Sequence, residues 1–386
     1  TSAAFEPSID YVVIKIPRWP FDKFKLADRT LGTQMKSTGE TMAIGRSFEE
    51  ALMKGWRSIG QGLGYPETIK WKKEKLEDKL RVPNDQRLTV IWNYLKRRNA
   101  SPRRIQRTCE LTDFHPFFIE RIGELVKIEN QLEKVKKNLP KNILLKAKHN
   151  GFSDSHISHL TGKKEETIRN QRKRMNITSS FLMVDTCAGE FEAKTPYFYS
   201  TYLDPKSEYK IGKSIVILGS GPIRIGQGIE FDYSTVHGVQ AVRKAGYEAV
   251  VVNNNPETVS TDFDASDRLY FEPLDAESVF EILDAEKPYG IILQLGGQTA
   301  VNLASEVEAY IKKEKLKTRI LGTKVRDMNA AEDRGKCGEL MRKAGIKMPK
   351  WAIAKNSDEV ITRAEEIGFP VLVRPSFVLG GRGMEI

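Results

Sequence analysis

The sequence predicts a multidomain α/β protein with a helical region between two α/β segments. Three observations support this prediction. The chain has 386 residues, which corresponds to two or three domains at roughly 150 residues each. Residues 206–325 alternate strand-like and helix-like segments, as in a parallel, doubly wound sheet. Residues 61–205 place apolar residues at helical spacing and contain few β-branched runs.

The expected elements follow in order along the chain. Residues 1–60 contain a strand at 11–16, closed by Pro17, and an amphipathic helix at 47–59. The helical region has 3.6-residue spacing at 88–95, 117–135, 143–148, 156–160 and 165–175. The alternating segment has strands at 214–218, 249–252, 290–295 and 319–322 and helices at 235–245, 276–285 and 300–312. Residues 326–386 add helices near 332–344 and at 356–367, the second with a capping box at Asn356 and Glu359 and a stop at Gly368, and a strand at 370–374.

Composition narrows the class of protein. Hydrophobic residues make up 40% and charged residues 29% of the chain, as in ordinary globular proteins. No run of 18 apolar residues occurs, so we expect no membrane span. Cys109, Cys187 and Cys337 are far apart and lack zinc-ligand spacing, which favours free thiols in a reducing compartment. Both ends look like cuts in a longer protein, because Thr1 is not a start methionine and the chain stops at Ile386, three residues after a glycine-rich loop.

The positive charge is concentrated in the helical region. Residues 71–180 carry 26 Lys+Arg and 13 Asp+Glu, whereas the rest of the chain carries 36 and 38. Residues 151–174 have the outline of a helix-turn-helix with a basic second helix, so a DNA-binding module is one alternative. The absence of a basic surplus elsewhere disfavours it, and a charged helix face is more often simply solvated. His149, His156 and His159 lack partners for a metal set, so we expect surface or capping roles for them.

The most informative segment is the glycine-rich turn at 219–228. Gly219 and Gly221 match the start of a dinucleotide fingerprint, but Arg224 replaces its third glycine and no acidic residue ends the second strand, so NAD is disfavoured. Polar side chains at the ends of parallel strands line the crevice where open α/β sheets bind ligands. The residues expected to converge there are Glu230, Asp232, Asn255, Glu257, Asp262 and Gln298.

Motifs along the whole chain resemble the large subunit of carbamoyl phosphate synthetase. They lie, in the order of that family, at 5–11, 33–40, 42–46, 184–188, 221–233, 255–262, 266–273, 296–299, 331–334, 373–376 and 379–382. The resemblance implies four pieces. Residues 1–60 would end a first ATP-grasp domain, 61–205 would form an all-α oligomerisation domain, 206–330 a Rossmann-like parallel pre-ATP-grasp lobe, and 331–386 the start of a second ATP-grasp fold.

The resemblance also implies an activity and its participants. The family is an ATP-dependent ligase that makes carbamoyl phosphate from bicarbonate, glutamine-derived ammonia and two ATP, for pyrimidine and arginine biosynthesis. It works in the cytoplasm with a glutaminase small subunit and forms homo-oligomers, here through 61–205, without nucleic acid or membrane. Its cofactors are ATP with Mg²⁺ or Mn²⁺, whose ligands would lie outside this chain, and the chain alone is not expected to be active. A related ATP-grasp ligase such as a biotin-dependent carboxylase is the second alternative.

The resemblance places functional residues in two groups. The ATP contacts would be Arg334, Arg374, Gly380, Gly381, Arg382 and Gly383. A guanidinium suits phosphate because its planar fork meets two oxygens at once, and glycines let backbone N–H groups approach closely. Glu40, Glu230 and Glu257 would line an internal carbamate passage. An alternative for Glu230 and Glu257 is that they only hold loops through backbone N–H groups.

Overall fold

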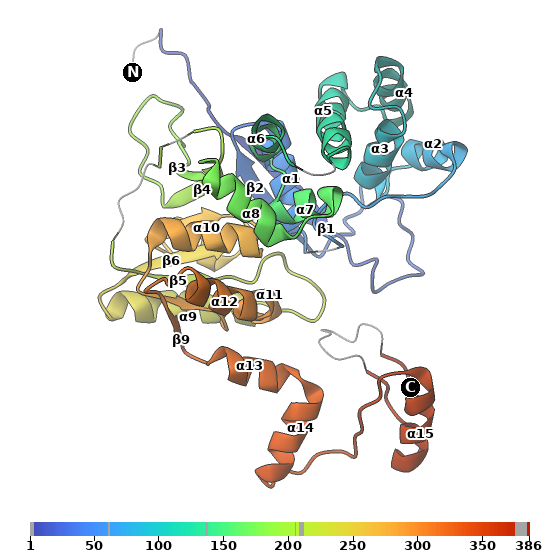
Figure 1. The fold of residues 1–386 in the computed structure, drawn as a ribbon, viewed down its shortest axis with the longest axis vertical. Helices are drawn as coiled ribbons and strands as arrows, with labels where there is room; N and C mark the ends of the chain where they lie inside the picture. The colour runs from blue at the N-terminus through green and yellow to red at the C-terminus, as the bar shows by residue number, and fades with distance from the viewer. Residues whose placement is uncertain (1–3, 61, 136–137, 205, 208–211, 375–383) are drawn as a thin grey trace.

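A computed structural model describes residues 4–60, 62–135, 138–204, 206–207, 212–374 and 384–386. A β-hairpin with one helix, a cluster of helices and a seven-stranded sheet pack together, and three further helices extend from the sheet (Figure 1). Three groups of buried side chains hold the described part together, one under the helices and one on each face of the sheet. No helix in the described ranges has both the length and the apolar character needed to cross a bilayer.

The N-terminal segment forms a hairpin followed by a helix. Strands β1 (Val12–Arg18) and β2 (Gly39–Gly45) pair antiparallel, and α1 (Phe48–Ser58) follows with Ser47 as its N-cap. β1 continues through Pro17, where we expected it to end. In the described part of the chain this sheet has two strands, and a residue without an N–H is tolerated on an edge strand. Lys54 of α1 is buried and donates to Ile44 O at 3.0 Å and to Glu272 of the lobe at 2.9 Å, so this segment is anchored in the sheet.

The helical region contains the five expected helices and two more. They are α2 (Lys73–Arg81), α3 (Arg87–Lys96), α4 (Pro102–Thr112), α5 (Pro116–Glu133), α6 (Lys141–His149), α7 (Asp154–Thr161) and α8 (Glu165–Arg174). α2 and α4 were not predicted, because charged residues dominate them and each buries few side chains. The seven helices α2 to α8 share one core, which includes Trp92 on α3 and Leu125 on α5.

The sheet is mixed, which corrects the expectation of a purely parallel one. Its strand order is β3-β4-β7-β6-β5-β8-β9, and all neighbours are parallel except β3 and β4. The strands are β3 (Ser180–Met183), β4 (Tyr197–Thr201), β5 (Ser214–Leu218), β6 (Glu248–Asn253), β7 (Arg268–Phe271), β8 (Gly290–Ile292) and β9 (Arg319–Leu321). Residues 180–201, assigned from the sequence to the helical region, thus supply two strands of this sheet. Both are short, β3 pairs with β4, and β4 joins the sheet through β7, which lies about 70 residues farther along the chain.

Helices cover both faces of the sheet. α9 (Glu230–Lys244) packs with Ile215 and Ile217, and the hairpin residue Ile44 joins this face. α10 (Ala276–Glu286) and α12 (Ala304–Lys313) pack with Val216 and Leu218 on the other face. The single helix expected at 300–312 is instead two helices. α11 (Gly297–Asn302) is followed by Leu303, which caps both α11 and α12. A short 3-10 helix, η1 (Val259–Thr261), follows β6.

The C-terminal segment consists of α13 (Val325–Glu332), α14 (Arg334–Lys343) and α15 (Ser357–Ile367). The capping box of α15 is confirmed, because Glu359 N donates to Asn356 Oδ1 at 2.9 Å and Gly368 is the C-cap. The prediction of a strand at 370–374 is wrong, because the described residues form no strand over this range. Val373 forms an isolated bridge with Glu385 there.

Candidate functional site

The glycine-rich turn lies where two strand ends approach each other closely. A Cβ on Gly296 would lie 2.2 Å from Gly219 O, so the turns after β5 and β8 meet backbone to backbone. Gly221 has φ +71°, and its N–H donates to Asn253 Oδ1 at the end of β6. Glycine is required in both turns, at Gly296 for space and at Gly221 for its backbone conformation.

Arg224 cross-links this turn rather than packing a helix against it. Its Nε donates to Gln227 Oε1 and its Nη2 to Thr299 Oγ1, each at 2.6 Å. Burial lowers the pKa of Arg224 from its usual value, although Asp22 of the first segment opposes this effect. The arginine that breaks the dinucleotide fingerprint therefore has a structural partner on the neighbouring strand end.

The three glutamates of the expected passage lie near the contact between hairpin and lobe. Lys15 of β1 forms an ion pair with Glu40 of β2, and its Nζ lies 3.9 Å from Glu257 Oε1. The hydrogen bond with Glu40 raises the pKa of Lys15. Glu230 is separate from this pair and accepts from Gly228 N at 3.1 Å. The structure thus joins Glu40 and Glu257 through one cation, and Glu230 also ties down the turn.

The other polar residues expected at the strand ends have different partners, and buried Asn255 accepts from Glu257 N at 3.0 Å. Asp232 is buried and accepts from Val259 N at 2.9 Å and Ser260 N at 3.2 Å, so it supports η1. Asp262 is exposed, and Gln298 donates to Asn302 on its own helix. Lys15 was not identified from the sequence. The signal available in the sequence was a lysine placed among the apolar residues of the strand β1.

The proposed ATP contacts are only partly described. Arg334 begins α14 and Arg374 follows Val373, and both side chains are exposed. Gly380, Gly381, Arg382 and Gly383 lie outside the described residues. No group of three or more His, Cys, Asp or Glu side chains suited to a metal occurs in the described ranges.

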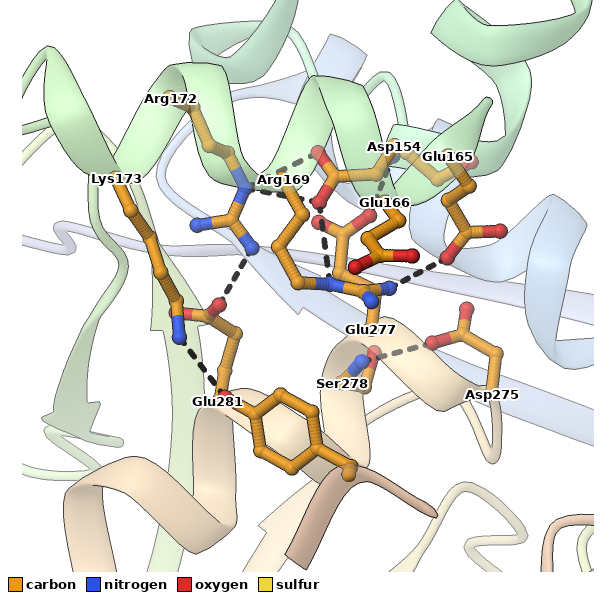
Figure 2. A network of polar contacts seen from close by, with 12 residues as sticks. Asp154, Glu165, Glu166, Arg169, Arg172, Lys173, Asp275, Glu277, Ser278 and Glu281 are labelled. Atoms are coloured by element: carbon orange, nitrogen blue, oxygen red, sulfur yellow. Dashed lines mark hydrogen bonds and ion pairs between the residues drawn. The ribbon is translucent and has the colours of Figure 1, made fainter. Parts of the chain in front are cut away.

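A buried network of ion pairs, missed by sequence reasoning, joins the helical region to α10 (Figure 2). Arg172 is 0% exposed, and its Nε lies 2.9 Å from Asp154 Oδ2 while its Nη2 pairs with Glu281. Lys148 Nζ lies 2.6 Å from Glu277 Oε1, and Lys173 Nζ lies 2.7 Å from Asp284 Oδ2. The basic face of α8 is therefore directed at acidic residues of α10, which argues against its use on DNA phosphates.

His156 departs from the surface or capping role expected for it. Its side chain is buried, and its ring stacks on Tyr65 at a centroid distance of 4.4 Å and on Phe152 at 4.9 Å. Burial lowers the pKa of His156 to about 3. It belongs to the helical core, and its ring is neutral at neutral pH.

Three family comparisons match successive parts of the chain. Residues 40–176 match the "Carbamoyl-phosphate synthetase large chain, oligomerisation domain", residues 212–330 the "Carbamoyl phosphate synthase preATP-grasp domain", and residues 333–386 the "Carbamoyl-phosphate synthase L chain, ATP binding domain". The large chain of carbamoyl phosphate synthase from Methanothrix thermoacetophila is 51% identical over 394 residues. This alignment covers 100% of the chain and 36% of that relative, so the chain spans about a third of the relative's length.

Two solved structures align with part of this chain, each at low sequence identity and low structural similarity. One is the biotin carboxylase subunit of a pyruvate carboxylase, with 22% identity, a TM-score of 0.25, and coverage of 45% of this chain and 37% of that one. The other is pyruvate carboxylase from Rhizobium etli, with 17% identity, a TM-score of 0.33, and coverage of 45% and 15%.

Proposed function

Because the chain belongs to the carbamoyl phosphate synthase large-chain family, we propose that its protein makes carbamoyl phosphate from bicarbonate, glutamine-derived ammonia and two ATP. The observation that carries the proposal is the contact between hairpin and lobe, where Lys15 joins Glu40 to Glu257. Such a contact between distant segments suits a reaction that passes an unstable intermediate from one ATP-dependent step to the next. The product would serve pyrimidine and arginine biosynthesis in the cytoplasm, where the free thiols of the three cysteines are stable.

The domain roles follow from the same proposal. Residues 1–60 would end the first ATP-grasp domain, which makes carboxyphosphate, and the helices of 61–205 would form the oligomerisation domain, whereas β3 and β4 in that range belong to the sheet. Residues 206–330 would be the pre-ATP-grasp lobe, and 331–386 would begin the ATP-grasp domain that phosphorylates carbamate. A glutaminase subunit would supply ammonia, and copies of the chain would associate through the helical region.

Phosphoryl transfer depends mainly on positioning and charge neutralisation. Arg334 and Arg374 would contact phosphate oxygens, because a planar guanidinium fork meets two oxygens at once, and both residues are exposed. Gly380, Gly381, Arg382 and Gly383 would form the loop above the phosphates. Mg²⁺ or Mn²⁺ would neutralise the phosphate charge, with ligands from other parts of the protein.

Glu40, Glu230 and Glu257 would line the passage for carbamate between the two ATP sites. Their negative charge would repel the anion from the walls and keep it moving. In the full protein, Glu230→Gln and Glu257→Gln should raise the number of ATP hydrolysed for each carbamoyl phosphate made. An unchanged ratio in both variants would remove the passage role and leave Glu230 as a loop-holding residue.

One experiment separates the main proposal from its alternative. The full protein with its glutaminase partner is supplied with ATP, glutamine and labelled bicarbonate, and the labelled product is identified. Carbamoyl phosphate formed with two ADP is the expected result. Transfer of the label to added biotin would instead favour a biotin-dependent carboxylase.

A further inference from the structure

The hairpin of the first segment lies directly on the glycine-rich turn of the lobe. Gly39, the first residue of β2, has no room for a side chain. A Cβ there would lie 2.6 Å from the carbonyl oxygen and 2.8 Å from the nitrogen of Ile223. These are backbone atoms, so they cannot swing aside as the end of a flexible side chain can. An ordinary contact of 3.4 Å would require the hairpin and turn to separate by roughly 0.8 Å.

Two side chains of the same segment fasten the turn from this side. Lys23 Nζ donates to Ile225 O at 3.0 Å, and the Thr38 hydroxyl lies 3.4 Å from both Ile223 O and Arg18 O, which share its single proton. On the opposite side, Arg224 donates to Thr299 of the lobe. The turn is therefore held between the hairpin and the sheet.

The same contacts set the positions of the three glutamates. Glu40 follows Gly39 directly, and Glu230 comes two residues after the end of the turn. β2 is also tied to the end of β6, because Met42 N donates to Asn254 O at 2.8 Å, three residues before Glu257. A shift of the hairpin against the turn changes the separation of Glu40 from Glu230 and from Glu257 together.

We propose that Gly39, assisted by Lys23 and Thr38, is a positioning device that keeps the two synthetase segments in register for carbamate transfer. This inference rests on the proposed function. The three residues contact no reacting atom and act through the turn at 219–228. A displacement of about 1 Å, even one distant from the chemistry, can lower a rate by as much as about 100-fold.

The test is Gly39→Ala in the full protein with its glutaminase partner. Two partial reactions report on the separate steps, namely bicarbonate-dependent ATP hydrolysis and the formation of ATP from ADP and carbamoyl phosphate. In the second reaction the phosphoryl group moves to ADP and carbamate leaves. We expect both partial rates to stay within about twofold, and the carbamoyl phosphate made per ADP released to fall about tenfold. Gly32→Ala is the matched control, because a Cβ there has nothing within 4 Å.

Each outcome bears on the proposal. An unchanged product ratio in Gly39→Ala overturns it. If both partial reactions are lost, the variant has lost its fold, and Lys23→Met combined with Thr38→Val decides instead, because this pair removes the hydrogen bonds without adding bulk. That pair should lower the product ratio as well, and an unchanged ratio there also overturns the proposal. Wild-type protein without bicarbonate-dependent ATP hydrolysis would defeat the proposed function itself.

Discussion

Replacing Arg172 with methionine should weaken the junction between α8 and α10 substantially. The side chain is 0% exposed, and its guanidinium bonds Asp154 at 2.9 and 3.1 Å and also pairs with Glu281. Removing one partner of a buried ion pair costs about 3–5 kcal/mol, because the other charge stays buried without compensation. Asp154 keeps Lys148 at 3.2 Å and Glu281 keeps Ser179 at 2.8 Å, so we expect the lower end, about 3 kcal/mol.

Urea unfolding followed by tryptophan fluorescence measures this loss. Trp56 and Trp92 lie in the helical core, with ring centroids 6.0 Å apart, and report on that region. With a slope near 3 kcal/mol per molar urea, the midpoint should fall by roughly 1 M. Lys173→Met is the control on the same helix. Its pair with Asp284 is about a third exposed, so the expected loss is at most about 1 kcal/mol.

A double variant tests the cause of the loss. The Arg172→Met variant leaves the carboxylate of Glu281 without its cationic partner, and adding Glu281→Gln removes that charge. The double variant should therefore be more stable than the sum of the two single losses predicts. Equal midpoint shifts for Arg172→Met and Lys173→Met would refute the reasoning. Simple additivity in the double variant would refute the coupling between Arg172 and Glu281.

Two further predictions concern the core and the turn. Burial lowers the pKa of His156 to about 3, below its value of about 6.5 in an unfolded chain, so stability from this site is complete above pH 6.5 and declines as the pH falls toward 3. His156→Phe should flatten that decline in urea midpoints measured from pH 7 to pH 4, and an identical slope would contradict the assignment. Gly296→Ala should cost about 1–3 kcal/mol, because its Cβ would lie 2.2 Å from Gly219 O, whereas a midpoint equal to that of Gly32→Ala would contradict the close approach.

Local patterns in the sequence predicted most helices and the strands β1, β5, β6, β8 and β9, but not β2 or β7. The helix at 47–59 and the strand at 214–218 were correct within two residues, because their apolar spacing and caps are local features. β3 and β4 were missed, because both are short and β4 joins the sheet through β7, about 70 residues farther along the chain. α4 was missed because its buried stripe is short and consists of Thr108, Leu111 and Thr112, of which only Leu111 is apolar.

The candidate site was predictable only in its parts. Glu40, Glu230 and Glu257 were identified through motifs, but their contacts were not. Lys15, which joins two of them, lies 25 residues from Glu40 and 242 from Glu257 in the sequence. The excess positive charge at 71–180 was also ambiguous, because a sequence does not show which cations face acidic partners.

The sequence by itself determined the family, the order of the helices and most strands, and the glycine-rich turn, because motifs, periodicity and caps depend on near neighbours in the chain. Only the tertiary structure decided what surrounds each charged group. It buried Arg172 against Asp154 and Glu281, and it placed Gly39 on Ile223. The contacts of Arg172 with Glu281 and of Gly39 with Ile223 join residues more than 100 positions apart, and no local pattern records them.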